Sequence, residues 1–202
     1  MKIHTVQTIR KIVLAVGIAI GVLIFAVTDS KHVTGSIMHE IIEWIGFVLI
    51  TICILGRTWS SLYIGGRKIE ELVTVGPYSV MRNPLYFFSI LGAAGVGAQS
   101  GSMVLALICG ALAYGVFSIV VLQEEKVLLE RYDDKYRGFM ARVPRFFPKP
   151  SLWTDQTTLT IHPRRVLMTF VDALIFLLAI PVAEGLEYLQ DIAVIPVFLT
   201  LP

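Results

Sequence analysis

Two adjacent carboxylates, Glu124 and Glu125, stand at the end of a long apolar run, where the chain would leave a lipid bilayer. A carboxylate at such a boundary is costly unless it meets a cation, so basic partners are expected close by. An earlier polar stretch, residues 57–83, contains Arg57 and Arg82. We therefore expect acidic and basic side chains from two separated stretches to converge on one pocket for a charged ligand.

The other stretch expected to contribute to this pocket has the sequence GPYSVMRNPLYFF, residues 76–88. Pro84 suits the first position of a helix, because its missing N–H costs nothing there. A simple return into the membrane would explain Arg82, Pro84 and Tyr86 one at a time, as an interfacial arginine, a helix start and an aromatic belt. It explains the whole group poorly, so we interpret the stretch as a turn whose polar groups face a ligand.

The elements that must position these residues are membrane helices. The chain is 55% hydrophobic and 16% charged, with a mean hydropathy of +0.75, which is typical of an integral membrane protein and not of a soluble domain. We predict an all-α integral membrane fold with five transmembrane helices, forming one membrane domain over residues 1–202. The predicted spans are residues 11–28, 41–62, 84–100, 103–122 and 166–183, with a cytoplasmic segment at 123–150 and an interfacial stretch at 192–201.

The distribution of Lys and Arg sets the orientation. With the N-terminus inside, all of the 17 basic residues except Lys31 fall on the cytoplasmic side of this five-span arrangement. The predicted protein is therefore multi-pass, with its N-terminus and the Glu124–Arg82 region in the cytoplasm and its C-terminus outside.

Only the four residues QSGS at 99–102 join the third and fourth predicted spans, which must form a tight antiparallel hairpin. Small residues such as Ala93 and Gly97 facing Ala106 and Gly110 would let the two helices approach closely. After the fourth span, Leu129, Tyr132, Tyr136, Phe139 and Val143 recur at helical spacing and predict a cytoplasmic amphipathic helix. A plain membrane-surface helix with a solvated charged face is the alternative interpretation.

The order of these motifs resembles the integral membrane methyltransferases that include isoprenylcysteine carboxyl methyltransferase and the phospholipid methyltransferases. The resemblance covers about residues 44–150. It rests on Gly76, Pro77, Tyr78, Arg82, Asn83, Pro84, Tyr86, Glu124, Glu125, Leu128, Arg131, Tyr132, Tyr136, Val143, Pro144, Arg145 and Pro148.

The resemblance implies an S-adenosylmethionine site and methyl transfer to a lipophilic or lipidated acceptor at the cytoplasmic membrane face. The ammonium group of S-adenosylmethionine would need a carboxylate, and its carboxylate would need an arginine. Its adenine would need aromatic walls. The residues expected to act in catalysis are Arg82, Asn83, Arg131 and Arg145. The residues expected to bind the cofactor are Gly76, Tyr78, Asn83, Pro84, Tyr86, Glu124, Glu125, Tyr132 and Tyr136.

Asn83 departs from the isoprenylcysteine pattern, which has His at this place, so no titrating role is carried over to it. The phospholipid branch tolerates Asn, whose amide can still bind a cofactor. Two other classes stay open, namely an NADPH-dependent membrane reductase of related architecture and a non-enzymatic membrane assembly protein. A net charge of +2 gives no reason to expect a nucleic-acid partner.

Metal chemistry is not predicted. His39 and Glu43 are one helical turn apart and could form a metal pair, but no third ligand is evident in the sequence. Glu184, Glu187 and Asp191 recur at helical spacing and are expected to form a solvated face. Cys53 and Cys109 lie in apolar runs without a CxxC spacing and indicate neither a disulfide nor a zinc site.

Overall fold

The structure is a computed structural model that describes residues 28–30, 36–65, 71–192, 194–195, 197 and 199–201. Within these ranges the regular elements are helices apart from two three-residue strands. Its elements are β1 (Thr28–Ser30), α2 (Ile37–Ile64), α3 (Pro77–Val80), α4 (Pro84–Ala98), α5 (Met103–Arg142), η1 (Pro150–Leu152), α6 (Pro163–Leu174), η2 (Ile175–Leu178), α7 (Ala179–Asp191) and β2 (Leu199–Leu201).

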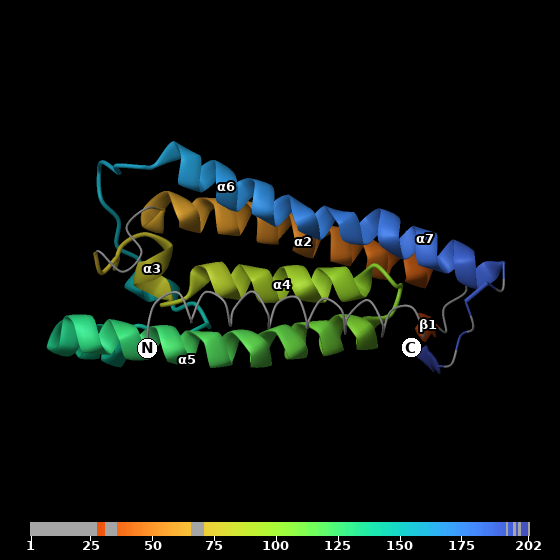
Figure 1. Cartoon of the computed structure of the whole chain (residues 1–202), viewed down its shortest axis with the longest axis horizontal. Coiled ribbons are helices and arrows are strands. Elements are labelled where there is room, and N and C mark those ends of the chain that lie inside the picture. Colours follow the sequence, from red (N-terminus) through yellow and green to blue (C-terminus); the bar gives the residue numbers. More distant parts are fainter. Residues whose placement is uncertain are drawn as a thin grey trace.

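The long helices lie roughly side by side, with α4 between α2 and α5, and with α6 and α7 along the far side of α2 (Figure 1). Sequence signals mark their ends. Ser36 and Ser102 cap α2 and α5 by accepting from the backbone N–H groups of His39 and Leu105. Pro84 begins α4 at its first helical position, as predicted. Many large apolar side chains on these helices are exposed, as expected for surfaces that face lipid.

Helices α2 and α4 approach each other closely through glycines. A Cβ added to Gly46 would lie 2.8 Å from the carbonyl oxygen of Gly95, and one added to Gly95 would lie 2.7 Å from that of Gly46. Either substitution would push the two helices apart. The predicted contact of Gly97 with the next helix is confirmed, because its Cβ would lie 2.5 Å from the Leu105 carbonyl oxygen. The α2–α4 contact was not predicted.

Three of the described helices are long and apolar enough to cross a membrane, namely Ile37–Ile64, Met103–Arg142 and Pro163–Gln190. They correspond to the second, fourth and fifth predicted spans. The third predicted span is α4, a shorter apolar helix of 15 residues, about 22 Å long by the helical rise. The first predicted span, residues 11–28, lies almost entirely outside the described residues, so the count of five is not confirmed.

One long helix is not straight, contrary to the predicted continuous amphipathic helix. Asp133 in α5 has φ 38° and ψ −114°, which is the geometry of the first central position of a type II′ turn. In a straight helix Glu125 and Met140 would be about 22 Å apart along the axis, yet one guanidinium group hydrogen-bonds to both. The chain therefore reverses at Asp133, and residues 134–142 fold back towards the bundle.

The two strands were not predicted. They pair in parallel, with Thr28 opposite Leu199 and Ser30 opposite Leu201. Figure 1 shows them at the end of the bundle where α7 ends. The stretch 192–201, expected to be interfacial, thus has its last described residues in a short sheet.

Candidate functional site

The shape of the turn at residues 76–83 is fixed by a close contact at Gly76 and by hydrogen bonds of Ser79. Gly76 has φ 59°, and a Cβ there would meet the ring of Tyr63 at 2.2 Å. The Ser79 hydroxyl donates to the Gly76 carbonyl oxygen at 2.7 Å and accepts from the Thr154 N–H at 3.0 Å. These constraints keep α3 to one short turn, so that Arg82 and Asn83 emerge directly before α4.

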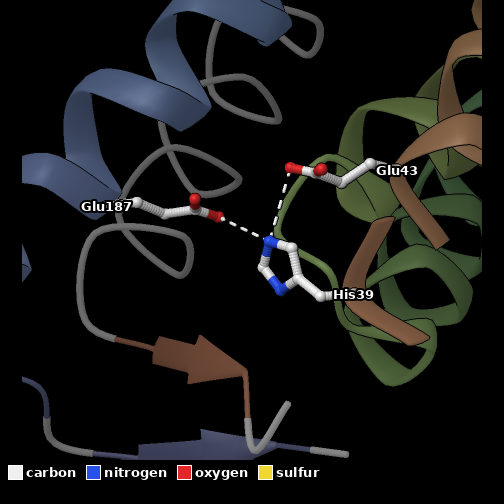
Figure 2. A group of neighbouring side chains, drawn as sticks. All are labelled: His39, Glu43 and Glu187. Atoms are coloured by element: carbon white, nitrogen blue, oxygen red, sulfur yellow. Dashed lines mark ion pairs between the residues drawn. The ribbon is translucent and has the colours of Figure 1, made fainter. Parts of the chain in front are cut away.

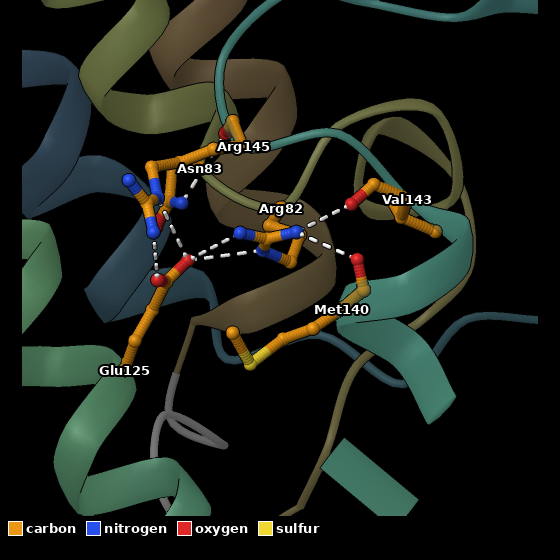
Figure 3. A network of polar contacts seen from close by, with 6 residues as sticks. All are labelled: Arg82, Asn83, Glu125, Met140, Val143 and Arg145. Atoms are coloured by element: carbon orange, nitrogen blue, oxygen red, sulfur yellow. Dashed lines mark hydrogen bonds and ion pairs between the residues drawn. The ribbon is translucent and has the colours of Figure 1, made fainter. Parts of the chain in front are cut away.

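Glu125 is the centre of a buried ion-pair network, which we call the Glu125 network (Figure 3). Its side chain is only 4% exposed and meets two guanidinium groups. Arg82 Nε donates to Glu125 Oε1 at 2.9 Å, and Arg82 Nη2 forms an ion pair with the same oxygen at 2.9 Å. Arg145 Nη2 donates to Glu125 Oε2 at 2.8 Å. Two cations around one carboxylate leave the Glu125 network with one net positive charge.

The remaining nitrogen of Arg82 is also used. Its Nη1 donates to the carbonyl oxygens of Met140 at 3.1 Å and Val143 at 2.6 Å, near the end of α5. The Arg82 side chain is 8% exposed, whereas that of Arg145 is 38% exposed. Arg82 therefore ties the folded-back part of α5 to the start of α4, and Arg145 is the guanidinium group within reach of a ligand.

Glu124 has different surroundings from Glu125. The Tyr86 hydroxyl donates to Glu124 Oε1 at 2.9 Å, and the Tyr86 ring lies 5.0 Å from the Phe117 ring between centroids. The Tyr86 hydroxyl is a neutral donor to Glu124, whereas Glu125 meets two cations.

Tyr78 lies next to this carboxylate, and its hydroxyl is buried without a hydrogen-bond partner among the described residues. Burial raises the pKa of the Tyr78 hydroxyl well above its ordinary value, and the negative charge of Glu124 raises this pKa further. Tyr78 thus stays protonated near neutral pH. An unpaired buried donor beside an anion is the kind of group that a ligand would satisfy.

The segment after α5 covers the turn. Arg82 N–H donates to the Pro144 carbonyl oxygen at 2.8 Å, Lys149 N–H to that of Val80 at 2.9 Å, and Gly76 N–H to that of Thr154 at 2.8 Å. The Asn83 amide does not cap α4 but donates to the Arg145 carbonyl oxygen at 3.2 Å. Two stretches separated in the sequence therefore meet, as predicted, at Arg82 with Glu125 and at Tyr86 with Glu124.

Not every expected site residue joins this group. Tyr136 is buried with Phe139 and Val143 in a hydrophobic cluster that Tyr132 contacts. Arg131 is exposed, and its guanidinium carbon lies 5.9 Å from the centroid of the Tyr132 ring. Pro84 is fully buried at the start of α4. The structure thus places Tyr136 against the folded-back helix and leaves Arg131 outside the Glu125 network.

Sequence reasoning missed several partners of this end of the bundle. Tyr63 donates to Asp155 at 2.9 Å, and the rings of Trp59 and Trp153 stack with centroids 5.7 Å apart. The depth of Arg57 in an apolar helix was a signal for a polar neighbour, and the structure supplies one, because Arg57 Nη1 donates to the Ser89 hydroxyl of α4.

The fold and the site define an integral membrane protein of packed helices with a cluster of opposite charges at one end. Residues 32–135 match the model of the phospholipid methyltransferase family. The chain belongs to this family, which fits the resemblance inferred from its motifs.

Two relatives carry names from metal resistance. The chain is 34% identical to the nickel-cobalt-cadmium resistance protein NccN of Alcaligenes xylosoxydans xylosoxydans, over 90% of this chain and 84% of the relative. It is 32% identical to the cobalt-zinc-cadmium resistance protein CzcN of Cupriavidus metallidurans, over 83% of this chain and 77% of the relative. No solved structure matches the chain significantly.

Proposed function

We propose that the protein transfers a methyl group from S-adenosylmethionine to a lipophilic acceptor in the membrane. Family membership supports methyl transfer as the reaction class. The observation that carries the proposal is the meeting, at one end of the bundle, of Arg82 with Glu125 and of Tyr86 with Glu124, across about forty residues of sequence. Arg145 joins Glu125 from 20 residues further along the chain. A site with both carboxylates and guanidinium groups suits a donor that is itself a zwitterion with a sulfonium.

Different residues suit different groups of S-adenosylmethionine. Glu124, whose hydrogen-bond donor Tyr86 is neutral, suits the ammonium or the sulfonium. Arg145, part exposed and belonging to a network with net positive charge, suits the carboxylate. The buried Tyr78 hydroxyl supplies an unused donor. Arg82 already contacts Glu125 and two carbonyl oxygens, so we propose that it positions the site and does not touch the reacting atoms.

The bound donor supplies an electrophilic methyl group, and the chain's own task is to orient the acceptor and exclude water. The segment 143–155 lies over the turn at 76–83 and suits the second task. The long apolar helices favour an acceptor that arrives through the bilayer, with a phospholipid-like amine or an isoprenylcysteine-like carboxylate at its polar end.

The test is binding of S-adenosylmethionine and of its demethylated product to purified protein by calorimetry, with transfer of radiolabelled methyl into a membrane lipid extract. We expect Glu124→Gln to weaken binding at least about tenfold, because a charge-assisted bond becomes a neutral one. Glu130→Gln is the matched control, since Glu130 is exposed on the same helix. Folded protein that binds NADPH but not S-adenosylmethionine would contradict the proposal.

The physiological setting that we propose is tolerance of divalent transition metals, supported by the names of the two relatives. A deletion strain complemented with the wild-type gene should regain growth in cobalt or nickel. The same strain complemented with Glu124→Gln should not, if methyl transfer is the activity that matters.

We further propose that the Glu125 network faces the cytoplasm. The second half of α5 and the segment that follows it carry Lys126, Arg131, Lys135, Arg137, Arg142, Arg145 and Lys149, and residues of this kind concentrate on the cytoplasmic side of membrane proteins.

A further inference from the structure

A second polar cluster lies at the opposite end of the bundle, where α2 begins and α7 ends. It consists of His39, Glu43 and Glu187, which we call the His39 cluster (Figure 2). Glu187, expected on a solvated face, instead points at His39 with a side chain only 15% exposed. The sequence offered the pair at positions 39 and 43, and the fold adds the third group from a helix about 140 residues later.

The geometry of the cluster centres on one nitrogen atom. His39 Nε2 lies 3.4 Å from Glu43 Oε1 and 3.6 Å from Glu187 Oε1, and all three ligand atoms lie within 4.8 Å of one another. His39 is 3% exposed, and neither of its ring nitrogens makes a hydrogen bond within the described part of the chain. A Cβ on Gly101 would lie 2.0 Å from Nδ1, so the α4–α5 turn fixes the ring in place.

These distances are long for an imidazolium that donates to carboxylates, because such bonds are about 2.7–2.9 Å. They match the edges of a coordination tetrahedron. With metal bonds of about 2.0–2.2 Å, two ligand atoms lie about 3.3–3.6 Å apart.

The charges of the His39 cluster also favour a bound metal cation. With a neutral imidazole, the carboxylates of Glu43 and Glu187 bring two negative charges to the same ring nitrogen, His39 Nε2. Like charges so placed repel strongly unless a counter-ion lies between them. A divalent cation would bring the sum of the charges to zero.

We propose that His39, Glu43 and Glu187 bind a divalent transition-metal cation at this end of the bundle. One imidazole and two carboxylates are the ligands of Zn²⁺, Co²⁺ and Ni²⁺ sites, whereas Mg²⁺ and Ca²⁺ prefer oxygen alone. Three protein ligands leave a coordination position for water or an exchanging ligand. The site is separate from the Glu125 network, so it does not depend on the proposed methyl transfer.

The test is calorimetric titration of the detergent-purified chain with Zn²⁺, after removal of any affinity tag. We expect one high-affinity equivalent, weakened at least about 100-fold in His39→Gln and in Glu187→Gln, because each loses a direct ligand. Glu40→Gln and Glu184→Gln are matched controls, since both glutamates are exposed on the same two helices. Both controls should bind Zn²⁺ as the wild type does.

A second measurement guards against variants that fail to fold. Zn²⁺ should raise the unfolding temperature of the wild type and of Glu184→Gln but not that of Glu43→Gln, whose side chain is 32% exposed in the wild type. Co²⁺ should give the intense visible absorption of a four-coordinate ion. Equal Zn²⁺ affinity of wild type and His39→Gln would overturn the proposal, as would folded wild type that binds no Zn²⁺ or binds Mg²⁺ equally well.

Discussion

At the scale of single residues, Glu125 has the largest electrostatic role at its end of the bundle. A nearly buried carboxylate that meets two guanidinium groups is stable only while all three charges are present, because each lost partner leaves an uncompensated charge. Sequence reasoning predicted that Glu124 and Glu125 would meet cations. It could not assign Glu125 to the arginines and Glu124 to Tyr86, because that choice depends on the helix rotation set by packing.

Replacing Glu125 by Gln should lower the free energy of unfolding by about 3 kcal/mol, because the buried guanidinium group of Arg82 would lose its counter-charge and the partly exposed one of Arg145 would lose its partner. Chemical unfolding in mixed micelles measures this loss. Arg137→Gln is the control, since Arg137 and its partner Asp133 are 68% and 74% exposed, and such a surface pair contributes about 0.5 kcal/mol or less. Equal losses in the two variants would show that the Glu125 network is not buried as described.

Tyr78 and Tyr86 should respond differently to loss of the hydroxyl. Tyr86→Phe removes a hydrogen bond to a carboxylate and should cost about 1.5–3 kcal/mol of stability. Tyr78→Phe removes a buried donor that makes no hydrogen bond within the described chain, so the free protein should be no less stable. If Tyr78 donates to the cofactor, its variant should nevertheless bind S-adenosylmethionine more weakly by calorimetry.

The raised pKa of Tyr78 also predicts a dependence of stability on pH. The unfolded chain loses this proton near pH 10, roughly the ordinary value for tyrosine, while the folded chain retains it. Above that pH the folded state binds more protons, so stability falls as pH rises. The decline should be shallower in Tyr78→Phe when unfolding midpoints are compared from about pH 9 to 11. An unchanged slope would contradict the burial of this hydroxyl.

At the scale of elements, Ser36, Pro84 and Ser102 mark the starts of α2, α4 and α5 chemically, although only Pro84 was used to predict a start and α2 begins four residues before the predicted residue 41. The reversal at Asp133 could not be predicted from the sequence. Residues 123–142 have good helix formers and helical spacing throughout, so local preference favours a straight helix. The turn is stabilised by contacts distant in sequence, above all those of Arg82 with the carbonyl oxygens of Met140 and Val143.

The turn gives a test of its own. Asp133 has a backbone geometry that glycine adopts easily and β-branched residues do not. Asp133→Gly should be at least as stable as the wild type, and Asp133→Val should be less stable than Asp133→Gly by about 2 kcal/mol. Since a straightened helix would withdraw the carbonyl oxygens from Arg82, the Val variant should also lose S-adenosylmethionine binding. Identical unfolding and binding of the two variants would mean that the chain does not reverse there.

At the scale of the whole molecule, the bundle separates two polar groups of different chemistry. The Glu125 network lies where α4 begins, and the His39 cluster lies beside the α4–α5 turn where α4 has ended, about 22 Å away along that helix. The apolar composition predicted a membrane bundle but not this second group, because Glu187 reaches His39 only through the packing of α6 and α7 along α2.

If the two groups lie at opposite membrane surfaces, single cysteines at each end should react from opposite sides. In a Cys109→Ala background, with Cys53 buried inside the bundle, we expect Glu184→Cys to be labelled by a membrane-impermeant maleimide on intact cells. Glu130→Cys, on the same helix as Glu125, should be labelled only after lysis, because basic residues concentrate around it and mark the cytoplasmic side. The reverse result would place the His39 cluster in the cytoplasm and the proposed methyl transfer outside, where S-adenosylmethionine, a charged molecule made inside the cell, would not reach it.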